Sequence, residues 1–104
     1  MEKQEVRKLL KELAEIAGVK NVKLEFREMR KKLASASLNK KIIRLNKTVL
    51  TLPDELIRYI LAHEIAHIKL KTRYHSKEFR EILTQLIGND DVEKLEKKLI
   101  GFII

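Results

Sequence analysis

Hydrophobic positions recur at intervals of three and four near the start of the chain. Over residues 2–17 they are Val6, Leu9, Leu10, Leu13, Ile16 and Ala17, with charged residues between them. This spacing predicts an amphipathic helix, because residues three and four apart share one helical face. Gly18 follows directly, and a glycine at this place is typical of a helix C-cap.

The pattern then changes to alternation between apolar and polar residues. Val22, Leu24 and Phe26 fall on one side of an extended chain, which predicts a strand. Two further extended stretches follow, and Asn39 marks a turn before the last. The three stretches are "VKNVKLEFR", "KKLASASL" and "NKKIIRLN", residues 19–27, 31–38 and 39–46. We expect them to form a small meander that is mostly antiparallel.

Helical signals return in the second half of the chain. Thr51 is a candidate N-cap and Pro53 suits a first helical turn, which predicts a helix over 53–70. Residues 71–75 form a connection, after which Ser76 is positioned to cap the next helix.

That next helix should run to Leu86 or Ile87 and end at Gly88. Asp90 or Asp91 would cap a last helix through about Leu99. The expected fold class is therefore α+β: an N-terminal helix, a three-stranded mostly antiparallel sheet, the helix over 53–70, and two C-terminal helices.

Composition narrows the class of protein. A chain of 104 residues is expected to form a single domain, and its 37% of charged residues would suit a thermophile. The sequence has no cysteine, which excludes disulfides and thiolate metal sites. It has no signal region and no apolar run of the ~18 residues that would span a bilayer. We expect a cytoplasmic protein with no membrane contact.

The net charge of +8 comes from one part of the sequence. Residues 20–49 contain ten Lys or Arg and only two acids, whereas the other 13 basic and 13 acidic residues cancel. Such a segment could bind nucleic acid weakly. The interpretation we favour is a solvated sheet edge whose lysines oppose aggregation.

Candidate chemistry lies in "LAHEIAHIKL", residues 61–70. His63 and His67 are four residues apart on a predicted helix, so both imidazoles can point at one metal ion. Glu64 is about 100° further round the helix, where it can act as a general base on a metal-activated water. The alternative is two buried structural histidines in the apolar stripe of the helix.

A catalytic site needs a third ligand. His75, the last of three histidines, follows in the connection, and the clustering of all three within 13 residues favours a shared zinc ion, one per chain. The open fourth position would make the site catalytic. Glu78 and Glu81 are alternative third ligands, although exposed helical charge is the interpretation we favour for both.

The stretch from Ala36 to Phe79 resembles a zincin pattern, in which a strand pair precedes "HExxHxK" and then "HSxxF". It is similar to the SprT-like metallopeptidases and most similar to the minigluzincins, small zymogen-like gluzincin peptidases on a minimal zincin-like scaffold. The resemblance implies a zinc metalloendopeptidase, a protease of peptide or protein substrates. It also implies His63, His67 and His75 as zinc ligands and Glu64 as the catalytic residue.

The resemblance implies two further features. A substrate would lie along the edge strand that matches residues 33–38, although an ordinary interior strand of small residues is equally compatible with "LASASL". Ser76 would be a helix cap and Phe79 a core residue, neither of them catalytic.

The apolar end of the chain, residues 99–104, can be interpreted in two ways. It could close the core or a dimer interface. The hypothesis we put forward is a latency tail that lies in the cleft, either within a monomer or swapped into a neighbouring chain of a dimer.

A different class of function remains open as an alternative. The chain could be a basic nucleic-acid-binding protein, or a DNA-associated protease, with a vestigial or structural zinc site. Against this, the aromatic residues do not cluster with the basic ones in a stacking pattern.

Overall fold

The computed structural model describes residues 1–98 of the chain. The order of the elements confirms the α+β class, and their bounds agree closely with the predicted ranges. The elements are α1 (Lys3–Ala17), β1 (Lys23–Arg27), β2 (Ala34–Ser37), β3 (Ile42–Asn46), the 3-10 helix η1 (Lys47–Thr51), α2 (Asp54–Leu70), α3 (Lys77–Ile87) and α4 (Asn89–Lys98).

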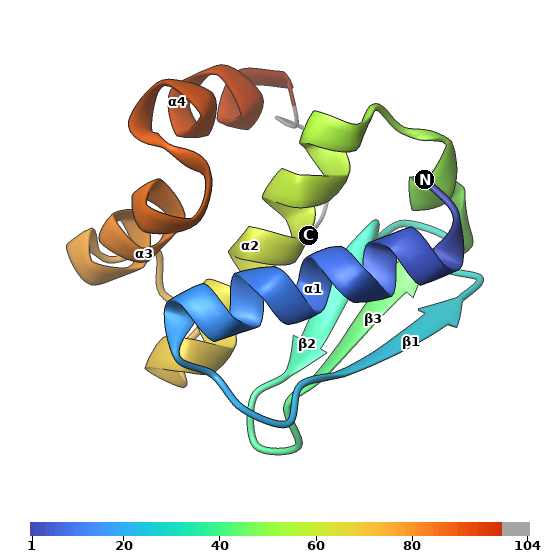
Figure 1. Ribbon diagram of the computed structural model, residues 1–104, viewed down its shortest axis with the longest axis horizontal. Coiled ribbons are helices and arrows are strands. Elements are labelled where there is room, and N and C mark those ends of the chain that lie inside the picture. The colour runs from blue at the N-terminus through green and yellow to red at the C-terminus, as the bar shows by residue number, and fades with distance from the viewer. Residues whose placement is uncertain (99–104) are drawn as a thin grey trace.

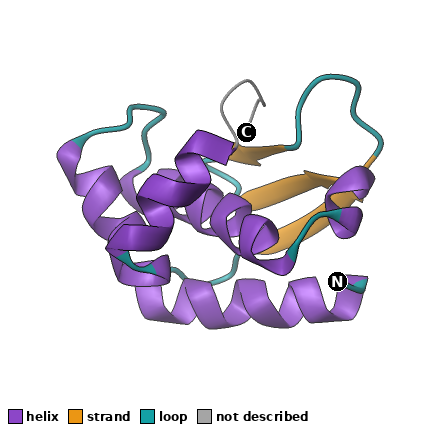
Figure 2. Cartoon of the chain, turned by 90° about the horizontal axis from the view of Figure 1, so that it is seen from above, coloured by secondary structure: helices purple, strands orange, loops and turns teal. Residues whose placement is uncertain are grey.

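Helix α2 is the centre of the structure. It contacts α1, α3, α4, β2 and β3, and the run from Tyr59 to Ile68 is buried without interruption. Figure 1 shows it between the sheet on one side and α3 and α4 on the other, with α1 crossing in front. Seen from above, α1 runs along one side of the molecule (Figure 2). A helical segment that is buried on every side must be apolar nearly all round, and residues 59–68 satisfy this except at the two histidines, Glu64 and the hydroxyl group of Tyr59.

The N-terminal helix is bounded as the sequence predicts. Val6, Leu10 and Leu13 are buried against the rest of the core, whereas Ile16 is 48% exposed. Gly18 adopts the left-handed conformation with φ 73°, and its N–H bonds to the last turn of the helix. The predicted C-cap is therefore confirmed, and the apolar stripe is one residue narrower than the spacing suggested.

The sheet is mixed, and the expected meander is wrong. Its strand order is β1-β3-β2, in which β1 pairs with β3 in parallel and β2 pairs with β3 antiparallel. The chain leaves β1, crosses over in residues 28–33, and places β3 in the middle, where Ile43 and Leu45 are fully buried. The most apolar strand thus takes the central position.

Asn46 holds that crossover in place. Its side-chain amide donates to the carbonyls of Met29 and Lys32, at 2.7 Å and 3.0 Å, and its oxygen accepts from the N–H of Thr48. Asn46 is only 6% exposed, so these bonds satisfy a buried amide. Thr51 is not the N-cap of α2 as predicted, because η1 intervenes and Pro53 occupies that position.

The C-terminal helices also follow their predicted signals. Ser76 Oγ accepts from the N–H of Phe79 at 3.2 Å, and Gly88 forms the C-cap of α3. Helix α4 begins at Asn89, so Asp90 and Asp91 lie in its first turn and do not cap it. Residues 99–104, including the predicted end at Leu99 and the latency tail, are outside the described residues. No helix formed by residues 1–98 is long and apolar enough to cross a membrane.

Candidate metal centre

Helix α2 presents two imidazoles on one face. His63 and His67 are 5% and 4% exposed, and their ring centroids are 4.7 Å apart. They lie one turn apart because they are separated by four residues in a helix. The helical interpretation of "HEIAH" is therefore confirmed, and both side chains are buried at the centre of the fold.

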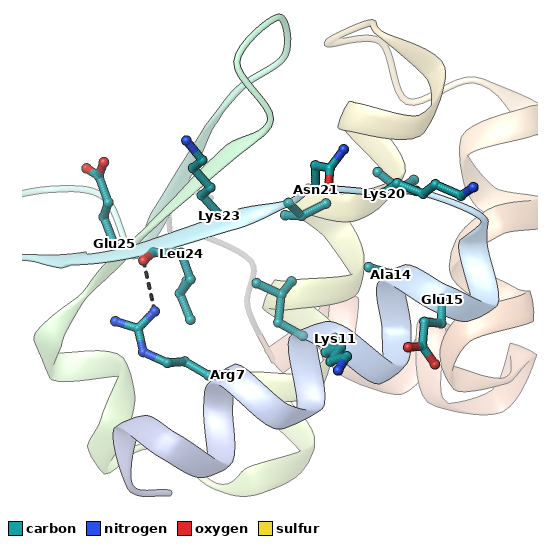
Figure 3. Close-up of a pocket in the computed structure, with 12 residues that line it drawn as sticks. Arg7, Lys11, Ala14, Glu15, Lys20, Asn21, Lys23, Leu24 and Glu25 are labelled. Atoms are coloured by element: carbon teal, nitrogen blue, oxygen red, sulfur yellow. Dashed lines mark hydrogen bonds between the residues drawn. The ribbon is translucent and has the colours of Figure 1, made fainter.

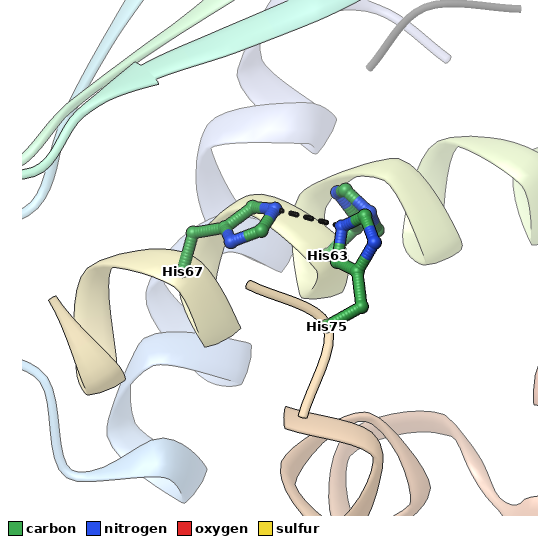
Figure 4. Close-up of side chains that lie close together, drawn as sticks. All are labelled: His63, His67 and His75. Atoms are coloured by element: carbon green, nitrogen blue, oxygen red, sulfur yellow. Dashed lines mark hydrogen bonds between the residues drawn. The ribbon is translucent and has the colours of Figure 1, made fainter. Parts of the chain in front are cut away.

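His75 reaches the same point from the following connection. Its Nε2 lies 3.3 Å from His67 Nε2, and one nitrogen of each of the three histidines lies within 4.8 Å of the others. Figure 4 shows the three rings directed toward one another, with His75 entering from the segment before α3. Within residues 1–98 this is the one group of three or more metal-competent side chains, and it contains neither Glu78 nor Glu81.

The turn that returns His75 has no glycine. Lys71 takes the left-handed conformation with φ 53° and ends α2 in the place where a glycine is usual. Thr72 N–H then bonds back to the His67 carbonyl at 3.3 Å. The connection is therefore short and closely tied to the last turn of α2.

The same turn fixes the tautomer of His67. His67 Nδ1 lies 2.8 Å from the carbonyl oxygen of Thr72. A carbonyl oxygen only accepts, so Nδ1 carries the proton and Nε2 keeps its lone pair toward the other histidines. This arrangement is the usual support for a metal-binding histidine, because the outer hydrogen bond orients the ring.

Glu64 is the most deeply buried charged residue of the site. It is 1% exposed, neither carboxylate oxygen has a hydrogen-bond partner among the described residues, and its Oε1 lies 3.7 Å from His63 Nδ1. Burying a carboxylate without a partner is costly. Its position beside the histidine cluster is therefore better explained by chemistry than by folding.

Burial lowers the pKa of two of the histidines below the usual value. For His67, burial is the largest cause, and the bond to Thr72 opposes it. The His75 residue as a whole is exposed, but partial burial of its ring again comes first among the causes of the lowered pKa, followed by the charge of His63. Both rings are therefore neutral at neutral pH, which is the form that binds a metal.

Three neutral imidazoles form a donor set that suits a transition-metal ion. Neutral imidazoles are common zinc ligands, and Zn–N bonds of about 2.0–2.1 Å in a tetrahedron place two nitrogens about 3.3 Å apart. The His67–His75 separation of 3.3 Å matches this value. The three histidines that the sequence singled out thus come together, with one pair at tetrahedral spacing and all three nitrogens within 4.8 Å of one another.

Sequence reasoning missed the aromatic surroundings of the cluster. The Phe79 ring centroid lies 5.1, 4.6 and 4.8 Å from those of His63, His67 and His75, respectively, so this core residue also forms one wall of the site. Tyr59 lies one turn before His63, and burial raises its pKa to about 12. The four-residue spacing from Tyr59 to His63 was a signal in the sequence that could have identified it.

Two of the hollows on the surface are similar in size and lie on different parts of the molecule. One of about 730 Å³ opens beside the histidines, with Tyr59, Phe79, Arg80 and Glu96 in its wall. The other, of about 750 Å³, lies between α1 and β1 and is lined by Arg7 and other residues of those elements (Figure 3). It contains no histidine, so the chemistry belongs to the first.

Strand β2 forms an edge of the sheet next to α2. Among residues 1–98 it pairs with β3 alone, and it contacts the helix that carries the histidines. Ala34 and Ala36 face the core, and Ser35 and Ser37 are half-buried on the other face. The stretch "ASAS" is thus an edge strand rather than an interior one.

Comparisons with known proteins agree with this geometry. Residues 2–100 match the family model described as a YgjP-like metallopeptidase domain. An uncharacterized protein of Aquifex aeolicus is 40% identical over 98 residues, which covers 92% of this chain and 88% of that protein. An uncharacterized protein of Methanocaldococcus jannaschii is 41% identical over 85 residues, or 75% of this chain and 76% of that protein.

Two solved structures are similar along most of their length. The metallopeptidase zymogen of Pyrococcus abyssi abylysin has a TM-score of 0.85 and 31% identity, and the match covers 95% of this chain and 99% of that one. The zymogen of Methanocaldococcus jannaschii jannalysin has a TM-score of 0.82 and 29% identity, covering 91% and 93%. The resemblance inferred from the motifs is confirmed.

Proposed function

Because the chain belongs to the YgjP-like metallopeptidase family, we propose that it is a zinc-dependent endopeptidase whose metal is held by His63, His67 and His75. One observation carries the proposal: the ligand atoms of these residues lie within 4.8 Å of one another, beside a carboxylate that is 1% exposed. Nitrogen donors favour zinc over calcium or magnesium, which prefer oxygen.

Glu64 is the proposed general base and acid. Zinc held by the three histidines would supply a Lewis acid for the peptide carbonyl and the attacking water. The Glu64 carboxylate would accept the proton of that water and then return it to the leaving nitrogen. Its burial removes competing solvent, and His67 keeps its orientation through the bond to Thr72.

A metallopeptidase acts on peptide or protein substrates, and the edge of β2 is the surface we propose for them. An extended peptide can add to a free sheet edge through main-chain hydrogen bonds. The small side chains of "ASAS" leave room for its backbone, and β2 contacts the helix that carries Glu64. A substrate bound there would run past the metal site.

The proposal is tested by hydrolysis of fluorogenic peptides with and without a chelator. We expect zinc-dependent cleavage, strongest in the chain truncated after Lys98, that the chelator abolishes. Glu64→Gln should retain zinc but lose at least about 100-fold in kcat, the scale of a positioned general base. Glu78→Ala, on the exposed side of α3, is the matched control and should behave as wild type. A zinc-loaded Glu64→Gln variant as active as wild type would contradict the proposal.

We propose that residues 99–104 keep the enzyme latent, as a monomer or a tail-swapped dimer. Support comes from the apolar sequence of this segment and from the similarity to two metallopeptidase zymogens. Truncation after Lys98 should raise activity of the zinc-loaded protein, measured with the same peptides. Light scattering would distinguish the two forms, and unchanged activity in a folded truncated chain would contradict latency.

The basic segment supports a second candidate function, weak nucleic-acid binding. Lys23 and Arg27 are exposed on the outer face of the sheet, and Arg30, Lys31 and Lys32 are exposed in the crossover. Glu25 lies 2.9 Å from Arg27 and 3.5 Å from Arg44, which reduces the charge of that face. DNA binding with a steep salt dependence would support this function, and its absence at low salt would exclude it.

A further inference from the structure

The connection that carries His75 is fastened to the sheet by Arg73. The Arg73 guanidinium donates to the carbonyl oxygen of Ala36, 37 residues away in sequence. Thr72 ties the same connection to His67, and Ser76 caps α3 directly after it. Among the hydrogen bonds of residues 1–98, that of Arg73 is the one that joins this connection to a strand.

The Ala36 carbonyl belongs to the edge of β2 that faces away from β3 and that residues 1–98 leave without a paired strand. The Asn46 N–H bonds to the Leu33 carbonyl, and the antiparallel register pairs Ser35 with Arg44. Backbone groups alternate in direction along a strand, so those of Leu33 and Ser35 face β3 and those of Ala36 face away. Arg73 therefore binds the edge where a peptide would pair.

The charge of Arg73 is unfavourable for metal binding at this place. A cation two residues from His75 repels a divalent ion, because like charges at short range raise its free energy. An anchor acts in the opposite direction, since a preorganised ligand loses less conformational freedom when the metal binds. The two effects of Arg73 on metal affinity thus have opposite signs.

We propose that Arg73 is a positioning residue, which holds His75 at the metal site by fastening its connection to the outer edge of β2. This inference rests on the proposed function, because it takes His75 to be a metal ligand. It assigns no contact with substrate or metal to Arg73 itself. The bond from Arg73 to Ala36 also couples the position of His75, the third ligand, to the edge of β2 proposed for substrate, so that a shift of one would move the other.

The test is the zinc affinity of the full chain, measured by competition with a chromophoric chelator. Arg73→Met should weaken zinc binding about 10- to 100-fold, the range typical of residues that support metal ligands, and should speed zinc release. Lys77→Met is the matched control. It removes an exposed cation two residues from His75 on the other side, and it should bind zinc as tightly as wild type or more tightly.

Arg73→Lys provides a second variant that keeps the charge and one donor. We expect Arg73→Lys to lose less zinc affinity than Arg73→Met. If Arg73→Met does not fold, the zinc affinity of Arg73→Lys tests the inference in its place. Melting of the metal-free proteins checks that the effect is local, and both Arg73 variants should melt within a few degrees of wild type.

Two outcomes overturn the inference: wild-type or tighter zinc affinity in Arg73→Met, or, if that variant is unfolded, wild-type affinity and release rate in Arg73→Lys. A wild-type chain that binds no zinc would instead contradict the proposed function.

Discussion

Glu64 has a buried carboxylate that the described residues leave without a hydrogen-bond partner. Such a group lowers stability, and proteins retain it mainly where the chemistry requires it. The bond from His67 Nδ1 to the Thr72 carbonyl also serves the chemistry, because it leaves the lone pair of Nε2 directed at the other histidines. At the scale of single residues, the site is arranged for a cation and a base.

The lowered pKa values of His67 and His75 make the metal-free protein sensitive to acid. An unfolded histidine titrates near about 6.5, whereas these two bind a proton only at lower pH when folded. Below about 6.5 the unfolded state therefore binds more protons, and the free energy of unfolding falls as the pH falls.

Urea denaturation in the presence of chelator, at intervals from pH 7.5 to 5.5, should show this loss. A carboxyl group in water has a pKa near about 4, below this window. In His67→Gln the pH dependence should be weaker. Stability that rises on acidification in the wild-type protein would contradict the assignment.

At the scale of elements, local signals predicted the helices well and the sheet poorly. Gly18, Ser76 and Gly88 each cap a helix at the position that the sequence predicted, because capping depends on residues close by in the chain. The order of strands depends on contacts between residues that are distant in the sequence, so local patterns do not determine it. The apolar content of β3 was the one feature of the sequence that favoured a central position. The sequence could predict His63, His67 and His75 as ligands because they fall within 13 residues of one another. The position of Phe79 in the wall of the site could be seen only in the folded structure.

Lys71 offers a test at the end of α2. A non-glycine residue with φ 53° is strained, and glycine at a left-handed C-cap position relieves that strain. Lys71→Gly should raise the free energy of unfolding by roughly 1 kcal/mol, measured by urea denaturation. Lys69→Gly, within the last turn of the same helix, is the control and should lower it by about 1 kcal/mol. A loss of stability in Lys71→Gly would contradict this description of the turn.

At the scale of the whole molecule, three parts of the fold meet at the site. Helix α2 supplies two histidines and Glu64, the connection after it supplies His75, and Arg73 joins that connection to the edge of β2. A bound ion would link the end of α2 to the start of α3, and binding to the native state alone stabilises a protein. The account therefore depends on the coordination of one metal ion by the imidazoles of His63, His67 and His75.

The zinc content of purified protein tests that coordination most directly. After loading with zinc and removal of excess metal, the wild-type chain should hold one zinc, and His75→Ala should lose most of it while remaining folded. Glu78→Ala, which removes one of the two alternative carboxylate ligands, should keep its full zinc content. A folded His75→Ala variant with wild-type zinc content, or a Glu78→Ala variant without zinc, would contradict the account.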